Sequence, residues 1–318
     1  MRTTEELQEF FRTEMIKQLE PLEQRRKGVL NQITIAAVVM GVIALIAGIF
    51  IGGSMGNPAG FLVPIIIGAV IIGVVSKFFS SGYVVDFKQS VIRPIVKFID
   101  KNLDYNPKDY IRKDVFMMSK IFTTRPNRYN GDDLVTGRIG STSLQFSELN
   151  AVYESGSGKD RHRTTVFKGL FFIADFNKDF RGTTIVLPDT AENLFGSLGK
   201  MFQGMNFFRG KLIKLEDPEF ERYFVVYGDD QIEARYILSP ALMSRIADFK
   251  KKTGSRVYLS FVGSMVFVAI WINRNLFEPR IFNTLLDFEP VRQYYEDLQL
   301  AAGIVEDLNL NTRIWSKQ

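Results

Sequence analysis

The sequence contains no cysteine and a single histidine. The lack of cysteine excludes disulfides, thiolate metal sites and a cysteine nucleophile, and it fits a reducing compartment. His162 lies between Arg161 and Arg163 in a polar loop, with no evident acid partner or metal co-ligand. We therefore assign no catalytic residue, metal ligand or cofactor site, and the sequence leaves open whether the protein is an enzyme.

Charged residues are missing from residues 31–76. Within this stretch, residues 33–53 and 61–75 are apolar, and the turn-forming residues Ser54 to Gly60 separate them. The first apolar segment has 21 residues, and at about 1.5 Å per residue a helix of this length crosses a hydrocarbon core of roughly 30 Å. The pattern predicts a transmembrane helical hairpin at residues 31–79.

Small residues recur at four-residue intervals in both apolar segments, at Ala44, Gly48 and Gly52 and again at Ala69 and Gly73. This spacing lets helix backbones approach closely. It favours packing of the two spans within one chain, with a homo-oligomer formed through the spans as the alternative. Ion or proton transport is weakly supported, because the spans carry no ionisable groups.

Positive charge is concentrated beside the predicted spans. Residues 77–128 carry eleven basic and five acidic side chains, whereas residues 129–318 carry 23 and 24. Because basic residues next to spans are retained in the cytoplasm, we expect a multi-pass inner-membrane protein with both termini cytoplasmic. The membrane-proximal basic residues are Arg25, Arg26, Lys27, Lys77, Lys88, Arg93 and Lys97. The folded part has no basic patch of the kind that binds nucleic acid, so no nucleic-acid partner is expected.

The sequence divides into four segments: an N-terminal cytoplasmic helix (1–30), the hairpin (31–79), a basic amphipathic helical connector (80–128) and a cytoplasmic domain (129–318). The N-terminal helix has one apolar face, which either packs on protein or lies in the membrane interface. From Tyr83 to Leu103 the connector suits either a helix on anionic headgroups or an ordinary helix kinked at Pro94. A further helix is expected from Pro107 to Phe122.

Aromatic and β-branched segments predict an α+β fold in residues 129–318, with a mostly antiparallel sheet and packed helices. The expected strands are residues 134–139, 144–153, 165–176, 183–187, 211–215 and 223–227. Residues 257–272 carry no charge, but they are short for a third span, and Gly263-Ser264 divides them into two strands of a hairpin. Helices are expected from Pro240 to Lys252 and from Pro290 onward.

The densest acidic region, around Asp217 and Asp229, has two interpretations. Paired carboxylates bind hard cations or act as acid and base, whereas Asp217-Pro218 also fits the cap and first turn of a helix. The structural interpretation is the favoured one.

Residues 194–210 combine four glycines with large apolar side chains. Such a composition suits either a mobile loop that docks on a partner or a helix that buries these side chains. The candidate partner surface consists of Phe195, Met201, Phe202, Met205, Phe207 and Phe208.

Five sequence blocks carry a family resemblance. They are Asp132–Val135 with Gly137, Phe167–Lys178, Val186–Asp189, Leu215–Glu221 and Glu233–Pro240. In these blocks the chain resembles a bacterial family of two-span membrane proteins that is catalogued as a domain of unknown function. The resemblance implies a bacterial inner-membrane setting, and the family supplies no activity or catalytic residues.

These observations favour a membrane protein whose cytoplasmic domain is a binding or scaffolding module for a protein or lipid partner. The alternative is a membrane-tethered enzyme that uses a carboxylate cluster on a membrane-associated substrate.

Overall fold

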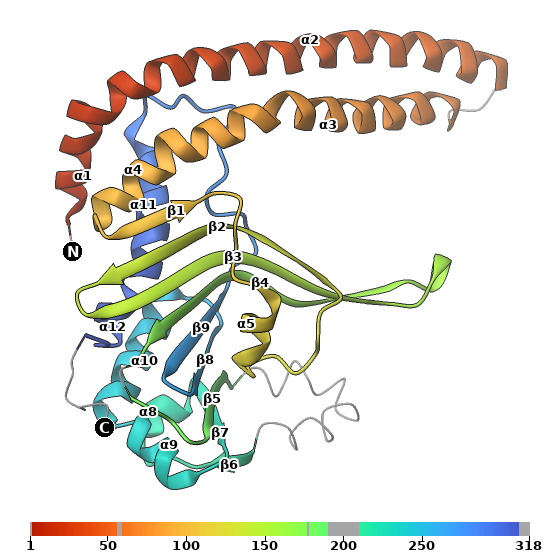
Figure 1. Ribbon diagram of the computed structural model, residues 1–318. Helices are drawn as coiled ribbons and strands as arrows, with labels where there is room; N and C mark the ends of the chain where they lie inside the picture. Colours follow the sequence, from red (N-terminus) through yellow and green to blue (C-terminus); the bar gives the residue numbers. More distant parts are fainter. Residues whose placement is uncertain (1, 56–58, 177, 190–209, 312–318) are drawn as a thin grey trace. The chain divides into compact units, whose positions relative to one another are not determined.

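The computed structural model describes residues 2–55, 59–176, 178–189 and 210–311 (Figure 1). Their contacts define two compact units. The helical unit comprises residues 2–95 and 277–294, and the sheet unit comprises residues 96–276 together with those from Tyr295 onward. Each unit is described by itself below.

The helical unit begins with α1 (Thr4–Phe10), a π-helical turn (Phe11–Met15) and α2 (Ile16–Met55), which follow one another without a break. Thr3 caps this run, because its hydroxyl accepts a hydrogen bond from the Glu6 amide while the Glu6 carboxylate accepts one from the Thr3 amide, at 2.7 Å. The helix expected at residues 4–30 is therefore present. It continues directly into the first apolar segment.

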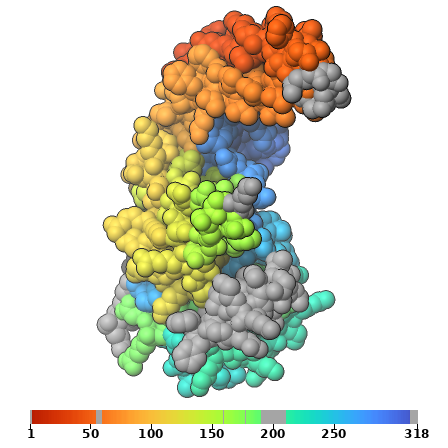
Figure 2. All heavy atoms as spheres, turned by 90° about the vertical axis from the view of Figure 1, so that its right-hand side faces the viewer, coloured from red at the N-terminus to blue at the C-terminus, as the bar shows by residue number. Residues whose placement is uncertain are grey.

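Helix α3 (Ala59–Phe87) runs back alongside α2, and the two helices lie side by side in both views (Figures 1 and 2). Small residues bring them together, because a Cβ atom built on Gly60 would lie 2.8 Å from the Gly52 Cα, and one built on Gly68 would lie 3.6 Å from the Ala44 Cβ. The ridge residues Ala44, Gly48 and Gly52 thus face α3 of the same chain. Both helices are long and apolar enough to cross a membrane.

A second π-helical turn (Lys88–Ile92) and α4 (Arg93–Ile99) continue the run of α3, and Pro94 lies directly after the π-helical turn. Apolar side chains from this stretch are buried, among them Tyr83, Phe87, Val91, Ile92 and Ile95. The helical part of the connector thus ends at Ile99, and its apolar side chains are packed inside the protein. Whether its basic side chains also meet headgroups stays a prediction. The apolar face of residues 4–30 is buried in the same way.

Residues 277–294 complete the helical unit, although they follow the last strand of the sheet in sequence. Phe288 packs on Phe11 with ring centroids 5.7 Å apart, and Tyr294 packs on Phe87 at 5.4 Å. We call residues 277–287, which precede the next helix, the return loop.

The sheet unit contains a nine-stranded sheet among its described residues, in the order β1-β2-β3-β4-β9-β8-β5-β7-β6. Every neighbouring pair is antiparallel. The strands are β1 (Leu103–Asn106), β2 (Arg128–Ile139), β3 (Thr142–Ser155), β4 (His162–Asp175), β5 (Thr183–Pro188), β6 (Lys211–Ile213), β7 (Phe224–Gly228), β8 (Val257–Val262) and β9 (Met265–Trp271). The predicted α+β class and antiparallel sheet are confirmed.

Strands β8 and β9 form the two-residue hairpin that the sequence predicted at residues 257–272. Gly263 adopts φ +62°, a conformation that glycine reaches without strain. The hairpin lies inside the sheet, where β9 pairs with β4 and β8 pairs with β5. Its apolar character therefore reflects burial on both faces, and these residues form no third span.

The remaining helices are α5 (Lys113–Met118), α8 (Pro218–Glu221), α9 (Gln231–Ile237), α10 (Pro240–Thr253), α11 (Phe288–Ala302) and α12 (Ile304–Asp307), with a short 3-10 turn at Gly158–Asp160. The expectation of a helix over Pro107–Phe122 is wrong for most of its length. Leu103–Asn106 pair with β2 as an edge strand, and the Leu134 amide donates to the Asp109 carbonyl at 3.0 Å. Residues 103–106 are thus held extended by the sheet, and residues 107–112 form a turn and an irregular segment before α5.

The core of the sheet unit is rich in aromatic rings. Phe116 on α5 packs against Phe171 on β4 with centroids 5.1 Å apart, and Phe122 packs against Phe167 at 5.2 Å. These contacts hold α5 on the sheet.

Candidate functional site

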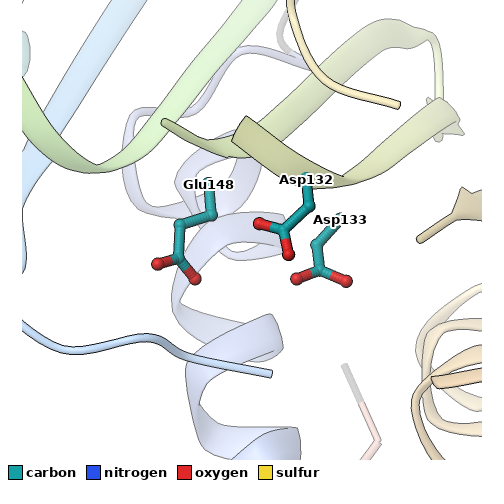
Figure 3. Close-up of side chains that lie close together, drawn as sticks. All are labelled: Asp132, Asp133 and Glu148. Carbon is teal, nitrogen blue, oxygen red and sulfur yellow. The ribbon is translucent and has the colours of Figure 1, made fainter. Parts of the chain in front are cut away.

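Three carboxylates gather where β2 and β3 pair. Asp132 lies opposite Glu148, and the pairing register shifts immediately after Asp132. The extra residue, Asp133, adopts φ +61°, as a residue in a β-bulge can. One carboxylate oxygen from each of the three residues lies within 4.8 Å of the others, and the side chains point to the same side of the strands (Figure 3).

Two of these carboxylates already accept hydrogen bonds from the protein. Asp133, which is 1% exposed, accepts a short hydrogen bond from the Tyr105 hydroxyl on β1. Glu148 is also buried and accepts one from the Leu276 amide at 2.9 Å. The cluster thus fixes the edge strand and the chain that follows β9 onto the bulge.

The chemistry of the cluster is that of a hard-cation site, because carboxylate oxygens are the ligands that Ca²⁺ and Mg²⁺ prefer. The hydrogen bonds to Asp133 and Glu148, however, give both carboxylates a structural role. In the sequence, Asp132 and Asp133 stand out only as part of a family block, and Glu148 does not stand out at all. The register of β2 on β3, which brings the three together, has no local signature.

A buried ion pair organises the helical unit. The Arg26 Nε and Nη2 atoms each donate to a carboxylate oxygen of Glu23 at 2.8 Å, and the two residues are 6% and 2% exposed. Arg26 also donates to the Ile281 carbonyl at 2.6 Å, and Glu23 accepts from the Leu285 amide at 3.0 Å. The pair therefore holds the return loop against α2 at two points.

The ion pair shifts the pKa values of both Glu23 and Arg26. The hydrogen bonds from Arg26 are the main cause that lowers the pKa of Glu23 to about 2, and the Leu285 amide adds to the effect against the opposing cost of burial. The same hydrogen bonds raise the pKa of Arg26. Both groups are thus charged throughout the physiological range.

The predicted membrane-proximal basic residues separate into two kinds. Arg26 and Lys88 are buried, and the Lys88 ammonium pairs with Glu278 of the return loop at 2.9 Å. They are not available to lipid headgroups. The others are exposed or half-buried, and four of them have polar partners: Arg25 with Asp86, Lys27 with Glu23, Arg93 with Gln89 and Lys97 with Asp104.

The acidic region around Asp217 and Asp229 is used for backbone capping. Asp217 accepts from the amides of Glu219 and Phe220 at the start of α8, and Asp229 accepts from the Thr183 amide at 3.0 Å. Asp230 caps α9 in the same manner. These bonds support the structural interpretation of the region.

The sequence also singled out His162 and a candidate partner surface. His162 is exposed at the start of β4, after the loop that joins β3 to β4. The candidate partner surface lies outside the described residues, as do all six side chains assigned to it: Phe195, Met201, Phe202, Met205, Phe207 and Phe208. That surface stays a prediction.

Comparison with solved structures gives a match to the crystal structure of the mycobacterial trehalose monomycolate transport factor A, TtfA. The two chains share 11% sequence identity with a TM-score of 0.34, over 66% of this chain and 93% of that one. No curated protein matches the sequence.

Comparison with protein families gives a match, over residues 165–310, to the family described as protein of unknown function (DUF3137). The matched region begins in β4 and ends after α12, and four of the five blocks that carry the resemblance lie entirely within it. Two helices long and apolar enough for spans precede it. Residues 165–310 thus match the domain of unknown function that the sequence blocks indicated, and the two apolar helices fit a two-span membrane protein.

Proposed function

We propose that the protein is an integral inner-membrane binding module. In this proposal α2 and α3 cross the bilayer as a hairpin, both termini are cytoplasmic, and the sheet unit binds a protein or lipid partner at the membrane. The proposal rests on the apolar surface of α2 and α3, which suits the hydrocarbon interior of a bilayer.

The supporting observation is the exposure of apolar side chains on α2 and α3. Most large hydrophobic side chains that the described residues leave exposed lie between Ile35 and Phe79, including Phe50 at 80%. Contiguous apolar surface on this scale is rare on soluble proteins. Before that stretch α2 buries the apolar side chains of Leu19, Leu22 and Val29, so its surface becomes apolar close to where the charge-free run begins.

The exposed cations that flank this surface support the proposed orientation. Arg25 and Lys27 precede the first apolar segment and Lys77 follows the second, and all three remain exposed although Arg26 and Lys88 are buried. The positive-inside rule therefore still favours cytoplasmic ends.

Membrane insertion is tested by alkaline extraction of membranes from cells that express the protein, which removes peripheral proteins and leaves spanning ones. We expect the protein to stay in the pellet. Protease added to spheroplasts should leave the sheet unit intact, and added to inverted vesicles it should degrade that unit. Release into the supernatant would end the spanning proposal, and digestion in spheroplasts would reverse the orientation.

Partner binding is tested by crosslinking in cells followed by purification in detergent. A variant in which Phe202 and Met205 are both changed to Ser addresses the partner surface predicted from sequence, and Met118→Ser, which alters an exposed apolar residue on α5, serves as the matched control. We expect the double variant to lose a specific protein or lipid that the wild type and the control retain. Recovery of no specific partner by the wild type would contradict the proposal.

The carboxylates near Asp217 and Asp229, on which an enzymatic alternative depends, are bound to backbone amides. No second function is therefore proposed.

A further inference from the structure

The return loop presents a large apolar side chain to solvent. Phe282 is 80% exposed and Leu286 is 40% exposed, whereas Leu285 between them is buried. Phe282 occupies the third position of a turn that the Asn283 amide closes on the Arg280 carbonyl at 3.0 Å. Transfer of an exposed Phe ring from water to an apolar phase is favourable, and the ordered turn holds this ring in an exposed position.

Hydrogen bonds to Arg26 and Glu23 fix the backbone of this turn beside α2. Arg26 holds the Ile281 carbonyl at 2.6 Å, and Glu23 holds the Leu285 amide at 3.0 Å. Phe282 is therefore tied to the helix next to Arg26.

If α2 spans the bilayer, the position of Arg26 along this helix lies within the headgroup layer. Arg26 is five residues before Asn31, where the charge-free run begins, and this separation corresponds to about 7.5 Å along a helix. The polar layer on each side of a roughly 30 Å hydrocarbon core is about 5–8 Å thick. The nearest apolar phase to Phe282 is thus the edge of the acyl region.

We infer that Phe282, with Leu286, is an interfacial membrane anchor that inserts into the headgroup and acyl boundary of the cytoplasmic leaflet. The inference rests on the proposed function, because it requires α2 and α3 to span the membrane. Aromatic rings are favoured at this depth. The exposed Arg280 in the same turn and Lys27 on α2 supply positive charge that suits anionic headgroups.

The absence of native cysteine allows a direct test. The single variants Phe282→Cys, Phe50→Cys and Arg12→Cys, all at exposed positions of the helical unit, are labelled with a nitroxide. They are reconstituted into vesicles of phosphatidylethanolamine and phosphatidylglycerol. Electron paramagnetic resonance power saturation then reports the accessibility of each label to oxygen, which partitions into lipid, and to a nickel chelate, which stays in water.

Phe50→Cys tests the spanning proposal, and Arg12→Cys marks an aqueous position that precedes Asn31 by 19 residues, or about 28 Å of helix. We expect the label at position 282 to show higher oxygen and lower nickel accessibility than the label at position 12. Its values should lie between those at positions 12 and 50.

Two results would overturn the anchor while leaving the spanning proposal intact. In the first, the label at position 282 has the same oxygen and nickel accessibility as the label at position 12, while the label at position 50 has the high oxygen and low nickel accessibility of a lipid environment. The other is loss of nickel accessibility at position 282 without a gain in oxygen accessibility, which means that protein covers Phe282. If position 50 itself is accessible to nickel, the spanning proposal fails and the anchor fails with it.

Discussion

Arg26 binds both carboxylate oxygens of Glu23 through two hydrogen bonds of 2.8 Å, and the pair is buried shortly before the charge-free run begins at Asn31. The Arg26→Ala variant leaves the buried Glu23 carboxylate with the Leu285 amide and the distant Lys27 ammonium as partners, and it also frees the Ile281 carbonyl. Removal of one partner of a buried pair costs about 3–5 kcal/mol. We expect a loss of this size in the free energy of unfolding, measured by chemical denaturation in detergent.

The control for this variant is Lys27→Ala. The Lys27 ammonium lies 4.0 Å from Glu23, but its side chain is largely exposed, so its removal should cost about 1 kcal/mol or less. Equal losses in the two variants would show that the Arg26 bonds do not hold the return loop.

The stability of the helical unit should fall in acid. The pKa of Glu23 is lowered to about 2 from 4.5, mainly by the hydrogen bonds from Arg26. A carboxyl whose pKa is lowered by folding contributes stability that is complete above its unfolded pKa and is lost as the pH falls through its folded pKa. We expect Glu23 to contribute roughly 3 kcal/mol at neutral pH, lost between about pH 5 and pH 2.

Denaturation of the wild type and of Glu23→Gln across this range measures that contribution. The wild type should lose stability more steeply than the variant. Glu289→Gln is the matched control, because hydrogen bonds from Arg292 also lower the pKa of Glu289 to about 2, but its side chain is half exposed. Because solvent screens the Glu289 ion pair, the control should lose unfolding free energy with falling pH nearly as steeply as the wild type.

The packing of α2 on α3 can be trapped covalently. A Cβ atom at residue 68 would lie 3.6 Å from the Ala44 Cβ, within the range of about 3.5–4.5 Å that a disulfide requires. We expect the Ala44→Cys/Gly68→Cys variant to oxidise within one chain and to migrate as a monomer on a non-reducing gel. Val74→Cys, on an exposed face of α3, should not crosslink, and a covalent dimer of the double variant would indicate that these ridges join different chains.

Gly169 on β4 is a position that tolerates no side chain. It has φ +140°, and an added Cβ would lie 2.2 Å from the Ile270 carbonyl oxygen on β9. Because the obstacle is backbone in the middle of the sheet, Gly169→Ala should cost about 3 kcal/mol or more in unfolding free energy. Gly263→Ala has φ +62° but open space around the new methyl group, so its cost should be about 1 kcal/mol.

Much of the fold could be predicted because its signals are local. The charge-free run identified the two apolar helices, and the Gly263-Ser264 turn separated the β8–β9 hairpin from a third span. The cap of α10 was also readable, since Ser239 accepts from the Leu242 amide and Gly254 ends the helix at φ +62°. Each of these features depends on residues close together in the sequence.

The features that were missed depend on distant partners. Arg26 and Lys88 count as membrane-proximal cations from sequence, yet each is buried by contact with the return loop, more than 180 residues further on. The carboxylate cluster likewise requires the register of β2 on β3, which places Asp132 opposite Glu148. No periodicity or spacing encodes such pairings.

The order of strands also constrains how the chain is made. Strands β4 and β5 are consecutive in sequence but are held apart by β9 and β8, so the centre of the sheet cannot close until Trp271 has been synthesised. Ribosomes add about 5–20 residues per second, so β4 must wait for its neighbour on the order of ten seconds while its edge remains open. The apolar helices are complete long before that moment. The chain should thus be delivered to the membrane as an unfinished sheet, and chaperones that bind open strand edges should be found on its nascent form.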